Sequence, residues 1–113
     1  MPYADVSSEI LSEIMDLLLQ ISCKFERRNG RYVVRRDRHI EDDISRLKTL
    51  SQKVPEPLSS LLVSMANSSD NFFWLWSKTV DALLELSTSD YVQGRWQIIA
   101  LSTRRPFQAL LPF

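Results

Sequence analysis

Residues able to carry catalytic chemistry are few in this chain. His39 is its only histidine and Cys23 its only cysteine, so at most one Cys–His pair can form. Cys23 falls within a helical pattern and is expected to be a buried, unreactive thiol, whereas His39 lies in a charged run and is expected to be solvated. No Gly-x-Ser-x-Gly sequence is present to position a serine nucleophile. We therefore predict that the protein is not an enzyme, and a small hydrolase is the weakest of three functional hypotheses.

Sequence motifs that hold cofactors or metals are also missing. The two glycines, Gly30 and Gly94, are isolated, which excludes a P-loop and a dinucleotide-binding fingerprint. Glu41, Asp42 and Asp43 are consecutive in a predicted helix, so their carboxylates point in three directions. The single cysteine excludes a multi-cysteine zinc site and an intramolecular disulfide. We predict neither a cofactor nor a metal.

A local block of positive charge lies at residues 24–38. It contains seven bases and two acids, although the whole chain has fourteen of each and no formal net charge. The arginines of this basic block are Arg27, Arg28, Arg31, Arg35, Arg36 and Arg38. Arginine forks bind phosphate oxygens and Tyr32 could stack on a base, so nucleic acid is one hypothetical ligand. The other interpretations are an acidic protein surface or a charged connector whose arginines pair with nearby acids. Nucleic-acid domains are usually basic overall, which favours the connector.

The aromatic run at residues 72–76 divides between two faces of a predicted helix. Phe72, Phe73 and Trp76 fall on its apolar stripe, whereas Trp74 falls on the opposite face, among charged residues that include Lys78. Either the aliphatic stem of Lys78 covers the indole, or another helix or chain does. Tryptophan is enriched at the centres of protein interfaces, so Trp74 is a candidate partner-binding residue.

Surplus apolar residues occur in three further segments. Leu19 falls on the back of the first predicted helix, and Trp96 in a segment with apolar residues on two sides. The apolar C-terminal tail, residues 104–113, contributes Phe107, Leu110 and Phe113. This much two-sided hydrophobicity in a small protein indicates association. We predict self-association, most simply as a symmetric dimer, or binding to a partner protein through these residues and Trp74.

Helical periodicity dominates the elements that must position these residues. An apolar stripe runs from Val6 to Phe25. The dipeptide Asn29-Gly30 that follows fits a left-handed helix cap, or a type I′ turn joining strands at Phe25–Arg28 and Arg31–Val34. The strong stripe upstream favours the cap.

Four further helices are predicted after the basic block. The second is capped by Asp37 and ends near Val54, and the third spans residues 57–65. The fourth spans residues 70–86. Residues 91–103 fit a helix or a buried strand, and helix is preferred because no partner strand is apparent. The expected fold is all-α: a compact four- to five-helix bundle.

Length and composition fit this expectation. The chain has 113 residues, 44% of them apolar and 25% charged, which is typical of one globular domain. Its longest uncharged stretch, residues 57–69, is too short to span a membrane, and no secretory pattern is visible. We expect a soluble intracellular protein, cytoplasmic or nuclear. The leading hypothesis is a non-enzymatic interaction or regulatory module; the alternative is a nucleic-acid-binding regulator using the basic block.

Overall fold

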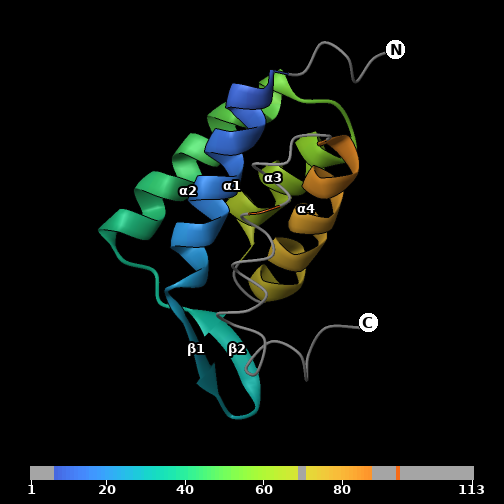
Figure 1. Ribbon diagram of the computed structural model, residues 1–113. Helices are drawn as coiled ribbons and strands as arrows, with labels where there is room; N and C mark the ends of the chain where they lie inside the picture. Colours follow the sequence, from blue (N-terminus) through green and yellow to red (C-terminus); the bar gives the residue numbers. More distant parts are fainter. Residues whose placement is uncertain (1–6, 69–70, 88–93, 95–113) are drawn as a thin grey trace.

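A computed structural model describes residues 7–68, 71–87 and 94 of the chain. The described part is mostly helical, with one small antiparallel sheet at one end (Figure 1). In chain order the elements are α1 (Ser8–Ser22), β1 (Phe25–Arg28), β2 (Arg31–Val34), α2 (Arg38–Leu50), the 3₁₀ turn η2 (Ser51–Lys53), α3 (Leu58–Asn67) and α4 (Phe72–Leu86). The predicted fifth helix, except for Gly94, and the apolar tail lie outside the described residues.

Helix α1 forms where the sequence predicts its apolar stripe. Ser7 caps it, because the Ser7 side chain accepts a hydrogen bond from the Glu9 amide at 3.1 Å. Its buried apolar residues are Leu11, Ile14, Met15, Leu18 and Ile21. The helix nevertheless ends at Ser22, three residues before the stripe does.

The prediction that Asn29-Gly30 caps a helix, and with it the strictly all-α fold, is wrong. Asn29 has φ 52° and Gly30 has φ 77°, so both residues occupy the left-handed region that a type I′ turn requires. The turn joins β1 to β2 with Phe25 opposite Val34 and Arg28 opposite Arg31. The resulting β-hairpin extends beyond the ends of the helices (Figure 1).

Helix α2 begins as predicted. The Asp37 side chain accepts a hydrogen bond from the Ile40 amide at 2.9 Å and caps the helix. The buried face of α2 contains Ile40, Ile44, Leu47 and Leu50. The α-helix ends at Leu50 and the turn η2 continues it, so the chain leaves helical geometry at Val54, close to the predicted end.

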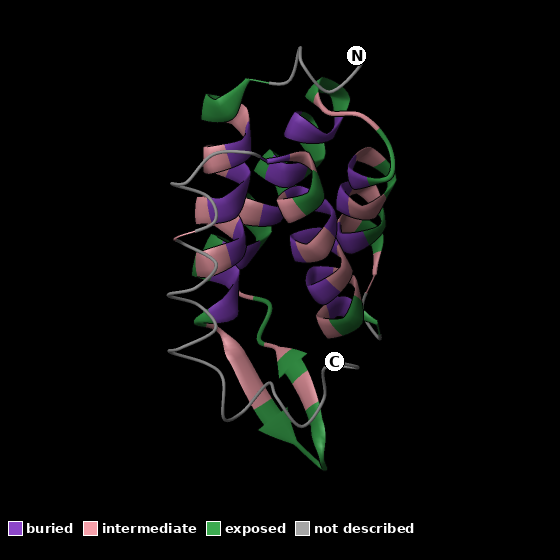
Figure 2. Cartoon of the chain, turned by 45° about the vertical axis from the view of Figure 1, so that its right-hand side comes forward, coloured by how far each residue is buried: buried purple, intermediate pink, exposed green. Residues whose placement is uncertain are grey.

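The four helices enclose one hydrophobic core, and its residues are the purple, buried segments of the helices in Figure 2. Trp76 of α4 is completely buried in this core, and its indole Nε1 donates a hydrogen bond to the Leu18 carbonyl of α1 at 2.9 Å. Two residues that are 58 positions apart in the sequence are thereby joined. Among the described residues no helix is both long enough and apolar enough to cross a membrane.

An aromatic cluster attaches the hairpin to the helices. The ring centroids of Phe25 and Trp76 lie 5.5 Å apart, and those of Tyr32 and Phe73 lie 5.1 Å apart. Phe25 also meets Phe73 edge-on at 5.2 Å. Such pairs stabilise packing beyond the area they bury. Phe25 therefore completes the apolar surface from a strand, although the sequence pattern placed it on a helix.

Candidate functional site

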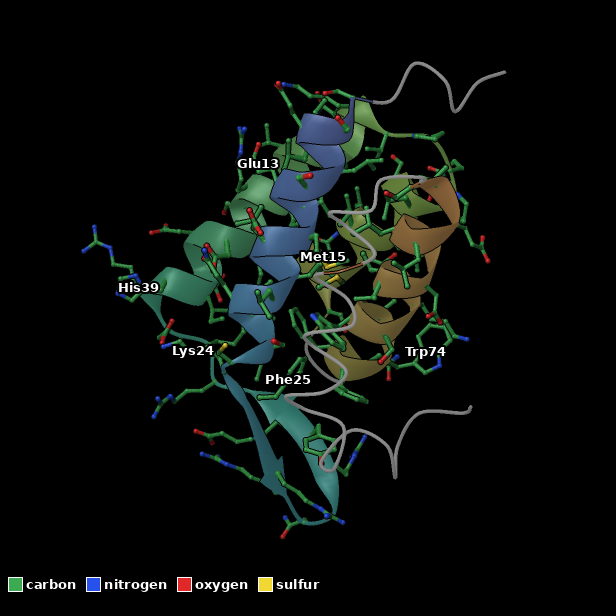
Figure 3. The ribbon with its side chains drawn as sticks, viewed as in Figure 1. Glu13, Met15, Lys24, Phe25, His39 and Trp74 are labelled. Carbon is green, nitrogen blue, oxygen red and sulfur yellow. The ribbon has the colours of Figure 1, made fainter. Side chains whose placement is uncertain are left out.

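Trp74 lies on the face of α4 that points away from the core (Figure 3). It is 56% exposed and is one of two large hydrophobic residues that are exposed in the described part of the chain. The Lys78 ammonium lies 5.6 Å from the centroid of the indole ring, one turn along the helix. This cation–π contact covers part of the ring, yet more than half of the residue stays accessible to a partner.

A groove runs beside Trp74, between α3 and α4. It has a volume of about 450 Å³. Pro57, Ser60, Leu61 and Ser64 line one side, and Trp74, Lys78, Asp81, Ala82 and Glu85 line the other. We call this surface the Trp74 groove. Its apolar floor and charged edge resemble the core and rim of a protein interface.

The charges of the Trp74 groove follow one row of α4. Lys78, Asp81 and Glu85 continue the row from Trp74 at spacings of four, three and four residues, so they lie on one face. Burial raises the pKa of the Asp81 carboxyl; the nearby Lys78 opposes this effect and Glu85 adds to it. Asp81 is thus a partly desolvated acid whose local environment does not fully compensate its charge.

The other predicted partner-binding residues are placed differently or not described. Leu19 is half-buried, and its side chain packs against the hydrophobic core. Trp96, Phe107, Leu110 and Phe113 lie outside the described residues. Of the predicted partner-binding set, Trp74 is the residue for which the described structure shows an exposed aromatic surface.

The residues considered for chemistry are dispersed. Cys23 is exposed, which corrects the expectation of a buried thiol: α1 has ended one residue earlier, so Cys23 lies in the turn that leads to β1. His39 is exposed in the first turn of α2, as expected. Within the described ranges, no group of three or more His, Cys, Asp or Glu side chains is arranged to hold a metal.

The hairpin distributes the basic block over two faces. Residues that are opposite each other in an antiparallel pair share a face, so Phe25, Tyr32 and Val34 lie on the inner side against the core. The outer hairpin face contains Glu26, Arg28, Arg31 and Val33, and Arg35 follows it directly. Tyr32, which was considered for base stacking, is instead held against Phe73.

Two bases of the block have structural partners. Arg36 binds Glu41 through Nε at 2.5 Å and Nη2 at 3.2 Å, and its Nη1 donates to the Ser68 carbonyl at 3.1 Å. Its guanidinium also lies 5.8 Å from the Phe72 ring centroid. Lys24 lies 3.4 Å from Asp37. Arg36 therefore connects the start of α2 to the end of α3, as the connector interpretation requires.

The remaining arginines of the basic block have fewer carboxylate contacts. Arg28 and Arg35 share the single carboxylate of Glu26, at 3.0 Å and 3.9 Å. Arg27, Arg31 and Arg38 are exposed, and no carboxylate in the described part of the chain lies within ion-pair distance of them. The hairpin, which lies at the lower end of Figure 3, thus carries positive charge that Glu26 does not neutralise.

Searches of protein families, of characterised proteins and of solved structures find no match to this chain. Two surfaces of the described structure could therefore bind a partner: the Trp74 groove and the outer hairpin face.

Proposed function

We propose that this protein is a non-catalytic interaction module that self-associates through the Trp74 groove. The observation that carries the proposal is the 56% exposure of Trp74 beside a groove with an apolar floor. A large exposed aromatic residue at the edge of such a groove is typical of protein interfaces. A second copy of the chain is the occupant that the charges of the groove favour.

The row on α4 is complementary to itself when two copies run antiparallel. If Lys78 lies opposite Asp81 of a second copy, two-fold symmetry places Asp81 opposite Lys78 of that copy. The same register places Trp74 opposite Glu85. Two cation–acid contacts therefore form at the centre, and each indole can lie along the aliphatic stem of a glutamate. A parallel arrangement would instead place like charges together.

Trp74 is expected to contribute most of the binding free energy of the dimer. Truncation of an interface tryptophan typically costs about 2 kcal/mol or more, roughly thirtyfold in the dissociation constant. Each exposed ion pair contributes less, up to about 1 kcal/mol. The charges accordingly select the antiparallel orientation, while burial of Trp74 supplies most of the binding free energy.

The proposal is tested by sedimentation equilibrium of the full chain. Trp74→Ala should weaken self-association about thirtyfold while the helical circular dichroism remains that of the wild type. Val33→Ala is the matched control, because Val33 is the other exposed large hydrophobic residue and lies on the hairpin. A wild-type protein that is monomeric at about 100 μM would refute self-association.

A charge exchange tests the orientation. Lys78→Glu alone places glutamate opposite Asp81 and should weaken the dimer, and Asp81→Lys alone should do the same. The double variant restores both contacts in the antiparallel register and should recover most of the affinity. If the double variant associates no better than the single variants, the antiparallel register is wrong.

A further inference from the structure

We infer that the outer hairpin face binds the phosphodiester backbone of nucleic acid. This inference is independent of self-association, because the outer hairpin face and the Trp74 groove share no residue. The arginines of the protein differ in how far carboxylates neutralise them.

Two arginines outside the hairpin, Arg36 and Arg46, are committed to neighbouring groups. Arg36 contacts both oxygens of Glu41, and Arg46 contacts both oxygens of Glu13 at 2.5 Å and 3.1 Å. The guanidinium groups of the hairpin have no such contacts: Arg28 and Arg35 divide one carboxylate, and their side chains are 67% and 65% exposed. The hairpin therefore presents guanidinium forks whose donors remain available to an anion.

The hairpin holds these forks in a fixed array. Phe25 and Tyr32 on its inner side pack against Phe73, so the outer side is presented by a ribbon that is anchored to α4. Arg31 and Val33 lie on one face of β2, Arg35 directly follows the strand, and Arg28 lies across from Arg31. A two-stranded ribbon of this kind is narrow enough to enter the major groove of a duplex.

Phosphate fits this surface better than an acidic protein does. Stable protein interfaces need an apolar centre, whereas the outer hairpin face offers Val33, 38% exposed, as its one large apolar residue. Binding to a phosphate backbone needs no apolar surface, since it gains its free energy from counterion release. The chain has no net charge overall, so the attraction is local and the affinity is expected to depend steeply on salt.

The test measures fluorescence anisotropy of labelled DNA of about 20 base pairs, two helical turns, and of one of its single strands. Three contacts, from Arg28, Arg31 and Arg35, predict a slope of log affinity against log salt near −2.7 for duplex, and roughly −2.1 for single strand. Arg31→Gln with Arg35→Gln should weaken binding at low salt and reduce the duplex slope by about 2. The matched control, Lys48→Gln with Lys53→Gln, removes the same charge from exposed positions of α2 and η2 and should leave the slope unchanged.

Each remaining outcome overturns the inference. Absence of saturable binding at about 50 mM salt would show that the hairpin is a solvated connector. An equal loss of DNA affinity in the control double variant would show that the whole protein surface attracts DNA and that the binding site is not on the hairpin. Tighter binding of poly-glutamate than of either nucleic acid would assign the surface to an acidic protein. Unchanged circular dichroism and thermal midpoint establish that both double variants are folded.

Discussion

Replacement of Trp76 by Phe tests the contact that joins α4 to α1. The change keeps an aromatic ring in the core but removes the Nε1 donor, which lies 2.9 Å from the Leu18 carbonyl. Trp76 is completely buried, so water cannot replace the lost hydrogen bond without entering the core. Because Leu18 lies near the end of α1 that precedes the hairpin, the loss also weakens the support of the hairpin.

Three contributions add to the expected destabilisation. The hydrogen bond contributes about 1 kcal/mol. Loss of roughly 40 Å² of buried apolar area costs about 1 kcal/mol, and the space left in the core costs about 1 kcal/mol more. The free energy of unfolding should therefore fall by about 3 kcal/mol, which lowers the thermal midpoint by about 13 °C for a chain of this length.

Thermal and urea unfolding followed by circular dichroism measure this change, with Trp74→Phe as the control. The control makes the same chemical change two positions away, on a residue that is 56% exposed, and should alter the free energy of unfolding by less than about 0.5 kcal/mol. Both variants are compared at dilution, where self-association contributes nothing. Equal losses in the two variants would refute the assignment of Trp76 to the core and Trp74 to the surface.

Two further predictions concern an ion pair and the turn. The hydrogen bond from Arg46 holds the pKa of Glu13 below its ordinary value of 4.5, so the pair stabilises the fold above that pH and the stabilisation is lost as pH falls through the lowered pKa. Urea unfolding of Glu13→Gln should show a loss of up to about 1 kcal/mol at pH 7 that vanishes in acid, and a loss that persists in acid would contradict the pKa shift. Gly30→Ala places a side chain at φ 77° and should lower the free energy of unfolding by about 1 kcal/mol, whereas a stabilising effect would mean that the turn is not left-handed.

The helices were predictable because their signals are local. A capping side chain and a stripe with helical spacing lie within one segment, and both Asp37 and the stripe of α2 occur where expected. The hairpin also has a local signal in Asn29-Gly30, but it is the less favoured of two interpretations because the stripe upstream has helical spacing. Phe25 has the spacing of the α1 stripe, but its contacts are with Phe72, Phe73 and Trp76, almost fifty residues later. Tertiary packing of the Phe25 ring thus decides between the two conformations that Asn29-Gly30 permits.

The two candidate surfaces also combine features that one segment predicts with features that depend on contacts between elements. Trp74 could be assigned to the exposed face because its neighbours at helical spacing are charged, and this is a property of α4 alone. The groove beside it also needs Pro57 and Leu61, which only the packing of α3 against α4 brings close. Which arginines of the basic block have partners also depends on distant groups, since Arg36 donates a hydrogen bond to the Ser68 carbonyl, 32 positions away. Sequence therefore locates surplus charge and surplus aromatic surface, but which of these groups remain available for a partner is decided by contacts between elements.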